Sequence, residues 1–176
     1  MKKLANEELN RISVDEFKKT EKSKLVVVLD NIRSLHNIGS VFRTSDAFLV
    51  ESIYLCGITA TPPNKEIHKT ALGATESVDW KYFKTTGEAI DALRKNNFKI
   101  YAIEQAENSV SLLDMTFDSN QPTAVIFGNE VYGVEQQVVD NCDACIEVPQ
   151  LGTKHSFNIS VTAGMVLWDY FSKTRV

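Results

Sequence analysis

The sequence predicts an α/β fold in which a mostly parallel sheet is flanked by helices. Short apolar runs of strand length alternate with stretches of helical periodicity, as expected when helices connect parallel strands. The run at 25–29, Leu-Val-Val-Val-Leu, is unbroken, which is typical of a strand that is covered on both faces. The 176 residues, 43% apolar and 24% charged, suffice for one domain with a substantial core.

The apolar patterns place the expected elements along the chain. Strands are expected over residues 25–29, 52–56, 78–83, 98–103, 123–127 and 144–148. Helices are expected over residues 38–48, 64–72, 86–96, 133–140 and 157–172. Residues 1–24 are a charged N-terminal extension whose apolar spacing predicts one or two short amphipathic helices, and residues 25–176 form the domain.

The composition excludes several classes of protein. With 8 Gly and 4 Pro the chain is not collagen-like, and no apolar run approaches the ~20 residues of a membrane-spanning helix. The first residues turn acidic where a signal peptide would become apolar, and three cysteines do not make a disulfide framework. We therefore expect a cytoplasmic protein that does not associate with membranes.

The charges are distributed unevenly. The formal net charge of -4 taken alone does not favour a nucleic-acid partner. No Lys or Arg lies between Lys99 and Lys154, a stretch with nine acidic residues, so the rest of the chain carries 19 basic and 14 acidic residues. This distribution permits a basic face opposite an acidic one, although such charge runs are also ordinary features of solvated surfaces.

Polar residues follow the first predicted strand. Asn37 is expected to cap the next helix, and Gly39 allows another backbone segment to approach closely. Arg43 lies in the second turn beside apolar neighbours, which is unusual for an exposed helical face. The alternative is a surface ion pair between Arg43 and Asp46, three residues further on.

Two more strands end in loops of the same kind. Gly128 is expected to expose backbone groups, and Glu130 to bind a cation such as Arg43 or a ligand amine. After the strand at 144–148, Ser156 is a plausible helix cap, whereas Asn158 is unusual beside so many apolar residues. Each feature also has a purely structural explanation as a turn or a cap.

Together the three loops predict a ligand site. The carboxyl ends of parallel strands share one edge of a sheet, where α/β proteins bind their ligands. The sequence has no G-x-G-x-x-G opening a βαβ unit and no G-x-x-x-x-G-K-[ST], so neither an ordinary dinucleotide loop nor a nucleoside-triphosphate loop is indicated.

Three motifs in this order resemble those of the SpoU family of RNA ribose 2′-O-methyltransferases, in the SPOUT class. They are N-x-G-x-x-x-R at 37–43, G-N-E-x-x-G at 128–133, and Pro149 followed by S-F-N-I-S at 156–160. The resemblance spans about residues 25–172. It implies a C-terminal trefoil knot, S-adenosylmethionine held in the knot crevice, and a homodimer whose active site draws on both subunits.

The resemblance also implies roles for individual residues. The family's catalytic positions fall on Asn37, Arg43, Glu130 and Asn158. We expect Arg43 to polarise the 2′-oxygen rather than to accept its proton, because a guanidinium stays protonated. The cofactor-binding positions fall on Ile103, Glu104, Gly128, Val148, Leu151, Ser156 and Phe157.

The implied activity is methyl transfer to a ribose 2′-hydroxyl of structured RNA, with tRNA expected because the chain is compact. The alternatives are rRNA as the substrate, a base nitrogen as the acceptor, a knotted RNA-binding protein without catalysis, and a small-molecule-binding protein. Phosphate contacts are expected from exposed cations: Arg33, Lys65, Lys69 and Lys154, with further ones from Lys18, Lys19, Lys22 and Lys24.

Two remaining features have simpler interpretations. Cys142 and Cys145 have C-x-x-C spacing without a second pair, so we expect apolar fillers and no metal site. The aromatic residues of the last helix, Trp168, Tyr170 and Phe171, are expected at a dimer interface rather than in the core.

Overall fold

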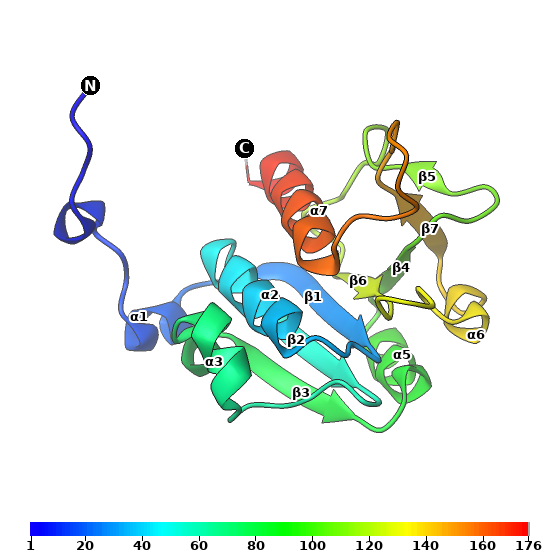
Figure 1. Cartoon of the computed structure of the whole chain (residues 1–176), viewed down its shortest axis with the longest axis horizontal. Coiled ribbons are helices and arrows are strands. Elements are labelled where there is room, and N and C mark those ends of the chain that lie inside the picture. Colours follow the sequence, from blue (N-terminus) through cyan, green and yellow to red (C-terminus); the bar gives the residue numbers. More distant parts are fainter. Residues whose placement is uncertain (176) are drawn as a thin grey trace.

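The computed structural model describes residues 1–175 and is built around one parallel sheet (Figure 1). Its strands are β1 (Ser23–Asp30), β2 (Val50–Cys56), β3 (Asp79–Phe83), β4 (Lys99–Ile103), β5 (Val110–Ser111), β6 (Thr123–Phe127) and β7 (Ala144–Glu147). Their order across the sheet is β3-β2-β1-β6-β4-β7-β5. All the strand pairs within the described residues are parallel, so the predicted fold class is confirmed.

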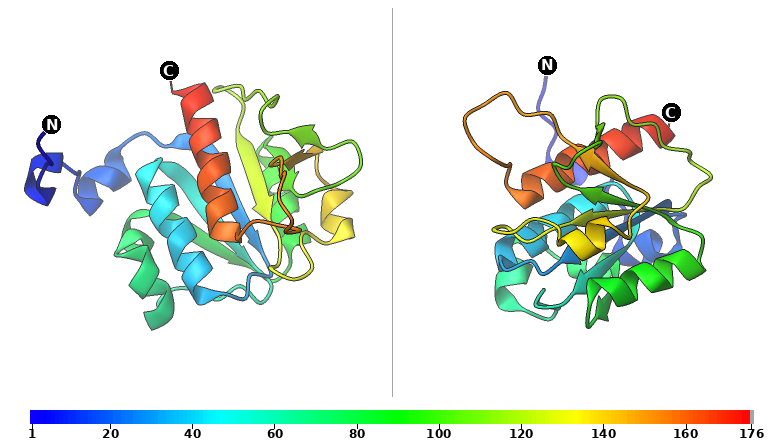
Figure 2. Two further views of the ribbon diagram at one scale, coloured as in Figure 1. Left: turned by 45° about the horizontal axis from the view of Figure 1, so that its top comes forward. Right: turned by 90° about the vertical axis from the view of Figure 1, so that its right-hand side faces the viewer.

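Helices cover both faces of the sheet (Figure 2). They are η1 (Asn6–Leu9, a 3-10 helix), α1 (Val14–Lys19), α2 (Leu35–Ala47), α3 (Lys65–Ala71), α4 (Ala74–Ser77), α5 (Thr86–Lys95), α6 (Gln136–Val139) and α7 (Ile159–Thr174). One core cluster joins the sheet to α1, α2, α3 and α7, and a second joins it to α5 and α6.

Strand β1 is buried on both faces, which explains why apolar and polar residues do not alternate in its sequence. Leu25, Val27 and Leu29 belong to the first core cluster, whereas Val26 and Val28 belong to the second. All five are at most 1% exposed, because both faces of a central parallel strand are covered. The prediction of a strand covered on both faces is confirmed.

The expected strands are all present, and the structure adds one. Strand β5 is only two residues long, too short to leave a periodic pattern, and it pairs with β7 at the sheet edge. Both helices at the motif loops begin differently from the prediction. Ser34, not Asn37, caps α2, and Asn158, not Ser156, caps α7.

Helix α7 packs beside α2, and the segment that leads to β6 covers its last turns. The Lys173 ammonium donates hydrogen bonds to the carbonyl oxygens of Leu112 (3.0 Å) and Met115 (2.8 Å). The Phe117 ring lies 5.0 Å from that of Tyr170, which is 2% exposed. Tyr170 is therefore a core residue, which corrects its expected place at an interface. The trefoil knot stays a prediction.

The start of the N-terminal extension, including η1, stands away from the body of the molecule, whereas α1 lies against it (Figure 1). The extension contains η1 and α1, as the amphipathic pattern predicted, and Phe17 of α1 is buried against the domain. Among the described residues, no helix is long and apolar enough to span a membrane.

Candidate functional site

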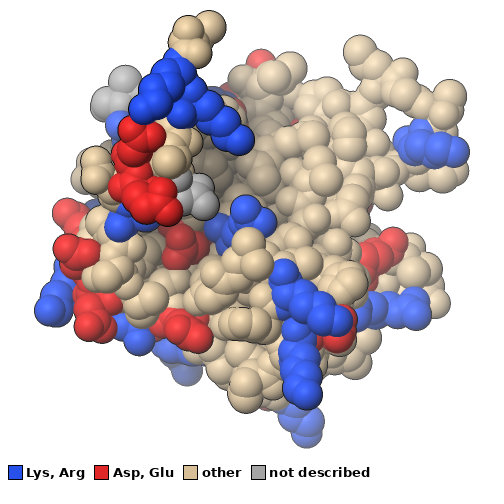
Figure 3. Space-filling model, turned by 60° about the vertical axis from the view of Figure 1, so that its left-hand side comes forward, with Lys and Arg blue, Asp and Glu red and all other residues tan. Residues whose placement is uncertain are grey.

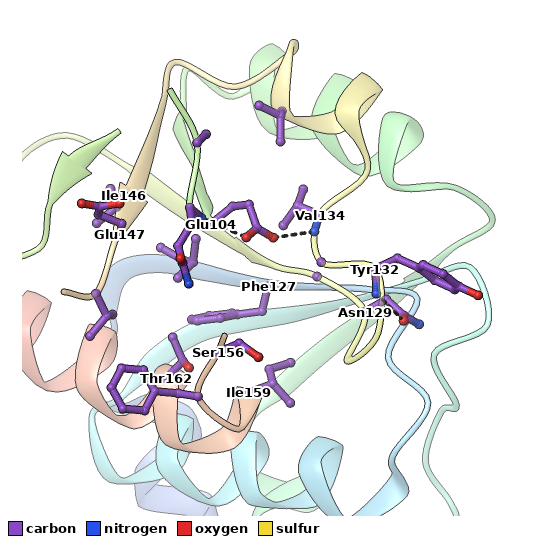
Figure 4. Close-up of a pocket in the computed structure, with 18 of the residues that line it drawn as sticks. Glu104, Phe127, Asn129, Tyr132, Val134, Ile146, Glu147, Ser156, Ile159 and Thr162 are labelled. Carbon is purple, nitrogen blue, oxygen red and sulfur yellow. Dashed lines mark hydrogen bonds between the residues drawn. The ribbon is translucent and has the colours of Figure 1, made fainter. Parts of the chain in front are cut away.

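A cleft of about 1160 Å³ lies at the carboxyl ends of β4, β6 and β7 (Figure 4). Six of the seven residues expected to hold the cofactor line it: Ile103, Glu104, Gly128, Val148, Ser156 and Phe157. Leu151 does not line it, because the loop after β7 carries this side chain fully into solvent. A pocket therefore forms at this edge of the sheet, and the cofactor-binding roles of these residues and of Leu151 stay predictions.

The loop after β6 is closed on itself. The backbone N–H of Asn129 donates to the Gly133 oxygen (2.9 Å), and the N–H of Gly133 donates back to the Asn129 oxygen (2.8 Å). A Cβ atom at position 128 would lie 2.1 Å from the Gly133 carbonyl carbon. Gly128 is thus required because the returning chain crosses directly over it.

Glu104, directly after β4, holds this loop in place by a hydrogen bond to its backbone. Its Oε2 accepts a hydrogen bond from the Val134 N–H (2.9 Å), as Figure 4 shows, and its Oε1 accepts one from the Gln105 N–H (2.9 Å). Gly133 has a φ of +69°, and a Cβ there would meet the same carboxylate at 2.2 Å. The carboxylate and the second glycine of G-N-E-x-x-G together fix the cleft wall.

A chain of side-chain hydrogen bonds connects the three motif loops. The Asn158 amide donates to Oδ1 of Asn37 (3.2 Å), and the Asn37 amide donates to Oε1 of Glu130 (3.2 Å). Glu130 and Asn158 line the cleft, whereas Asn37 lies behind them with 9% of its surface exposed. Three of the four residues expected to be catalytic are therefore brought together.

Both carboxylate oxygens of Glu130 accept hydrogen bonds from the backbone at the start of α2. They accept the N–H groups of Arg33 (3.0 Å) and Ser34 (2.9 Å). Burial raises the pKa of Glu130, but these hydrogen bonds outweigh it and hold the pKa below its ordinary value. The expected cation partner, Arg43, is not among these contacts; backbone amides take its place.

Arg43 lies apart from the cleft in this single chain. Its side chain is exposed on α2 and is not among the lining residues. The alternative ion pair with Asp46 is also absent from the described residues, where the Asp46 carboxylate instead accepts a hydrogen bond from the Ser77 hydroxyl. The close approach expected at Gly39 is present, since a Cβ there would lie 2.2 Å from the Ile67 oxygen in α3.

The cleft is acidic. Five carboxylates are among its lining residues, whereas no Lys or Arg is: Glu104, Glu107, Glu130, Asp140 and Glu147. Its floor is apolar and includes Phe127, Ile146 and Val148. Such a cleft suits a ligand that carries positive charge and an apolar or aromatic body.

Asn31 and Asn129 hold the loops beside the cleft in place, a role that the sequence did not lead us to expect. The Asn129 amide donates to the Asn31 carbonyl oxygen (2.7 Å), and its Oδ1 accepts the N–H groups of Val131 (2.9 Å) and Tyr132 (3.2 Å). Asn31 has a φ of +54°, and its side-chain oxygen accepts the Ile58 N–H (3.1 Å). For Asn31 the available signal was the tolerance of Asn for a left-handed backbone directly after a strand, and for Asn129 it was the tendency of an Asn side chain to accept N–H groups two residues on in a turn.

The cations expected to contact RNA are on the surface. Arg33, Lys65, Lys69 and Lys154 are all exposed. Lys69 pairs with Glu66 at 2.7 Å, and Glu66 also lies 3.3 Å from His36. On the face shown in Figure 3, Lys and Arg side chains lie among Asp and Glu side chains, so this face is mixed rather than uniformly basic.

The cysteines behave as apolar fillers. Cys56, Cys142 and Cys145 are free thiols and none is exposed. Burial raises the pKa values of Cys56 and Cys142 to about 12 each, so neither forms a thiolate near neutral pH.

Comparison with known proteins places the chain in a family. The SpoU rRNA methylase family matches residues 24–168. A protein of Staphylococcus haemolyticus, named for the TrmH family of tRNA/rRNA methyltransferases, is 29% identical over 163 residues. The match covers 90% of this chain and 64% of that relative, so the chain spans less than two thirds of its length.

Solved structures agree on the fold. The TrmH/SpoU tRNA modifying enzyme of A. aeolicus superposes with a TM-score of 0.80 at 24% identity, covering 92% of this chain and 82% of that one. The AdoMet-bound rRNA methyltransferase of Sinorhizobium meliloti gives 0.79 at 24% identity, covering 88% and 59%. With its motif loops, its sheet and its matched residues in agreement, this chain belongs to the SpoU rRNA methylase family.

Proposed function

We propose that the chain transfers a methyl group from S-adenosylmethionine to the ribose 2′-hydroxyl of a structured RNA in the cytoplasm, and that this RNA is tRNA. The observation that carries the proposal is the hydrogen-bonded chain from Asn158 through Asn37 to Glu130, which holds all three motif loops at one cleft. Family membership and the AdoMet-bound relative support the same reaction.

The cleft fits this cofactor. S-adenosylmethionine carries a sulfonium and an ammonium group, and the carboxylates of Glu104, Glu107 and Glu147 lie among the lining residues without a Lys or Arg to oppose them. Phe127, Val148 and Phe157 offer apolar surface for its adenine. When bound, the cofactor supplies an electrophilic methyl group.

The protein positions and polarises the acceptor. We assign Arg43 the role of hydrogen-bonding the 2′-oxygen and stabilising the negative charge that develops there, while the hydroxyl proton leaves to solvent. Asn37, Glu130 and Asn158 then act as positioning residues, because their polar atoms are engaged in holding the loops together.

A homodimer would bring Arg43 to a cleft. Arg43 is exposed on α2 and does not line the cleft of its own chain. Helix α7, packed beside α2, leaves Trp168 57% exposed and Val161 48% exposed, which is apolar surface that a second copy can cover. We therefore propose that Arg43 acts on the cleft of the partner subunit.

The proposal is tested by incubating the chain with labelled S-adenosylmethionine and RNA from a strain lacking the gene. The RNA is supplied as separate tRNA and rRNA fractions, and the products are digested to nucleosides for mass spectrometry. We expect a 2′-O-methylated nucleoside from the tRNA fraction, with none from DNA of the same sequence, because DNA lacks the 2′-hydroxyl. A base-methylated nucleoside, or RNA binding without methyl transfer, would refute the proposal.

A further inference from the structure

We propose that Tyr132 is a stacking platform for a nucleobase of the RNA substrate, beside the ribose that receives the methyl group. The inference rests on the proposed function and deepens it. Tyr132 is 82% exposed although it lines the rim of the cleft, and it follows Glu130 by two residues. A large aromatic side chain left in solvent at a binding site provides contact area for a planar partner.

The loop that carries Tyr132 is held rigid by hydrogen bonds. The Tyr132 backbone N–H donates to Oδ1 of Asn129 (3.2 Å), and Asn129 and Gly133 close the loop with two backbone hydrogen bonds of 2.9 and 2.8 Å. The Asn129 amide anchors the loop to the Asn31 oxygen at 2.7 Å. Because the backbone of this loop is already fixed, stacking of a base on the ring costs only the conformational entropy of the Tyr132 side chain.

The surrounding charges define the side from which RNA approaches. The carboxylates inside the cleft repel phosphate groups, so the RNA backbone is kept at the rim. Arg33 is exposed at this rim, since its backbone N–H lies 3.0 Å from the Glu130 carboxylate. Figure 4 shows Tyr132 directed away from the cleft interior, on the side of Asn129.

Tyr132 and Arg33 are both exposed, and both lie close to Glu130: Tyr132 follows it by two residues, and the Arg33 backbone N–H donates to its carboxylate. An aromatic ring and a cation on one rim match the way proteins hold unstacked nucleotides. The ring stacks on a base, and the cation contacts the adjoining phosphate. A phosphate near Arg33 and a base on Tyr132 would bracket the ribose between them and present it to the cleft. Neither contact requires a particular base, so Tyr132 would select an unstacked nucleotide but would not select a particular base sequence.

The test measures binding of unfractionated tRNA, from a strain lacking the gene, to the full chain saturated with S-adenosylhomocysteine. Stacking contributes about 1–3 kcal/mol per base, so we expect Tyr132→Ala to weaken tRNA binding about 5- to 150-fold. Tyr132→Phe and Tyr132→Trp keep the ring and should bind within about twofold of wild type. Tyr82→Ala removes an exposed tyrosine from β3, an edge strand whose Tyr82 does not line the cleft, and should not change tRNA binding.

Cofactor affinity, measured by calorimetry, should be the same in all of these variants. Unchanged tRNA binding by Tyr132→Ala, or an equal loss in Tyr132→Phe, would overturn the stacking proposal while the wild type still methylates RNA. Equal losses in Tyr132→Ala and Tyr82→Ala would also overturn it. Failure of the wild type to methylate any RNA would instead refute the proposed function.

Discussion

The side-chain amide of Asn37 donates a hydrogen bond of 3.2 Å to Oε1 of Glu130, 93 residues further along the chain. Through its own side-chain oxygen, Asn37 accepts a second bond from Asn158. One nearly buried amide therefore joins the start of α2, the loop after β6 and the start of α7. The family motifs converge because their side chains satisfy one another, as buried polar groups must.

Replacing Asn37 tests the strength of this connection. Asn37→Ala removes one of the two hydrogen bonds that Oε1 of Glu130 accepts, the other coming from the Ser34 N–H, and leaves the Asn158 amide without its acceptor. We therefore expect a loss of about 1–3 kcal/mol in the free energy of unfolding. Asn120→Ala, at an exposed asparagine far along the chain, should stay within about 0.5 kcal/mol of wild type. Urea denaturation measures both, and equal effects would contradict a structural role for the Asn37 amide.

Substituting Gly128 tests the crossing of the loop after β6. In Gly128→Ala the new methyl group would collide with the Gly133 backbone at 2.1 Å, so the cleft wall must move. We expect cofactor affinity, measured by calorimetry, to fall at least about tenfold, equivalent to about 1.4 kcal/mol. Gly152→Ala is the matched control, because nothing lies within 4 Å of a Cβ there. Tight cofactor binding by Gly128→Ala would disprove the crossing.

The depressed pKa of Glu130 predicts a pH dependence of stability. The unfolded chain takes up a proton at this carboxyl group at higher pH than the folded chain does, so stability rises with pH in that window. The stabilisation is complete above the ordinary pKa of 4.5 and is lost as the pH falls through the lower folded value. In urea titrations, the stability difference between wild type and Glu130→Gln should therefore stay constant above about pH 5 and shrink as the pH falls below it. A difference that does not shrink at low pH would contradict the hydrogen bonds to Arg33 and Ser34.

The exposed lysines of α3 should make RNA binding depend on salt. Each phosphate contact contributes about one to the slope of log K against log salt, so Lys65→Ala should reduce the slope by about one unit. Lys95→Ala, on the opposite face of the sheet in α5, should leave the slope unchanged. Equal slopes for wild type and Lys65→Ala would remove Lys65 from the RNA contact surface.

Much of this fold is readable from local sequence. The β-branched run of β1, the helical periodicities and the polar loops after each strand each reflect a local physical preference. Strand β5 was not predictable, because two residues leave no pattern. Its position depends on pairing with β7, which follows it by more than thirty residues.

The site was predictable in its residues but not in their contacts. Asn37 and Ser156 were expected to cap helices, whereas Ser34 and Asn158 do so. Which of several nearby polar residues caps a helix depends on the residue at which the backbone becomes helical, and the side-chain types do not specify that residue. The partners of Glu130 are backbone amides, which no side-chain pattern specifies. The exposed position of Arg43 likewise depends on how α2 packs against α3 and α7.

The central proposal is a catalytic site that combines the motif residues of one chain with Arg43 of another. Its direct test is to mix Arg43→Ala and Asn158→Ala proteins, each nearly inactive alone, after unfolding and refolding them together. If Arg43 acts across the dimer, half of the dimers are mixed and each regains one complete site, giving about one quarter of wild-type methyl transfer. Activity no higher than that of the separate variants would show that Arg43 serves the cleft of its own chain.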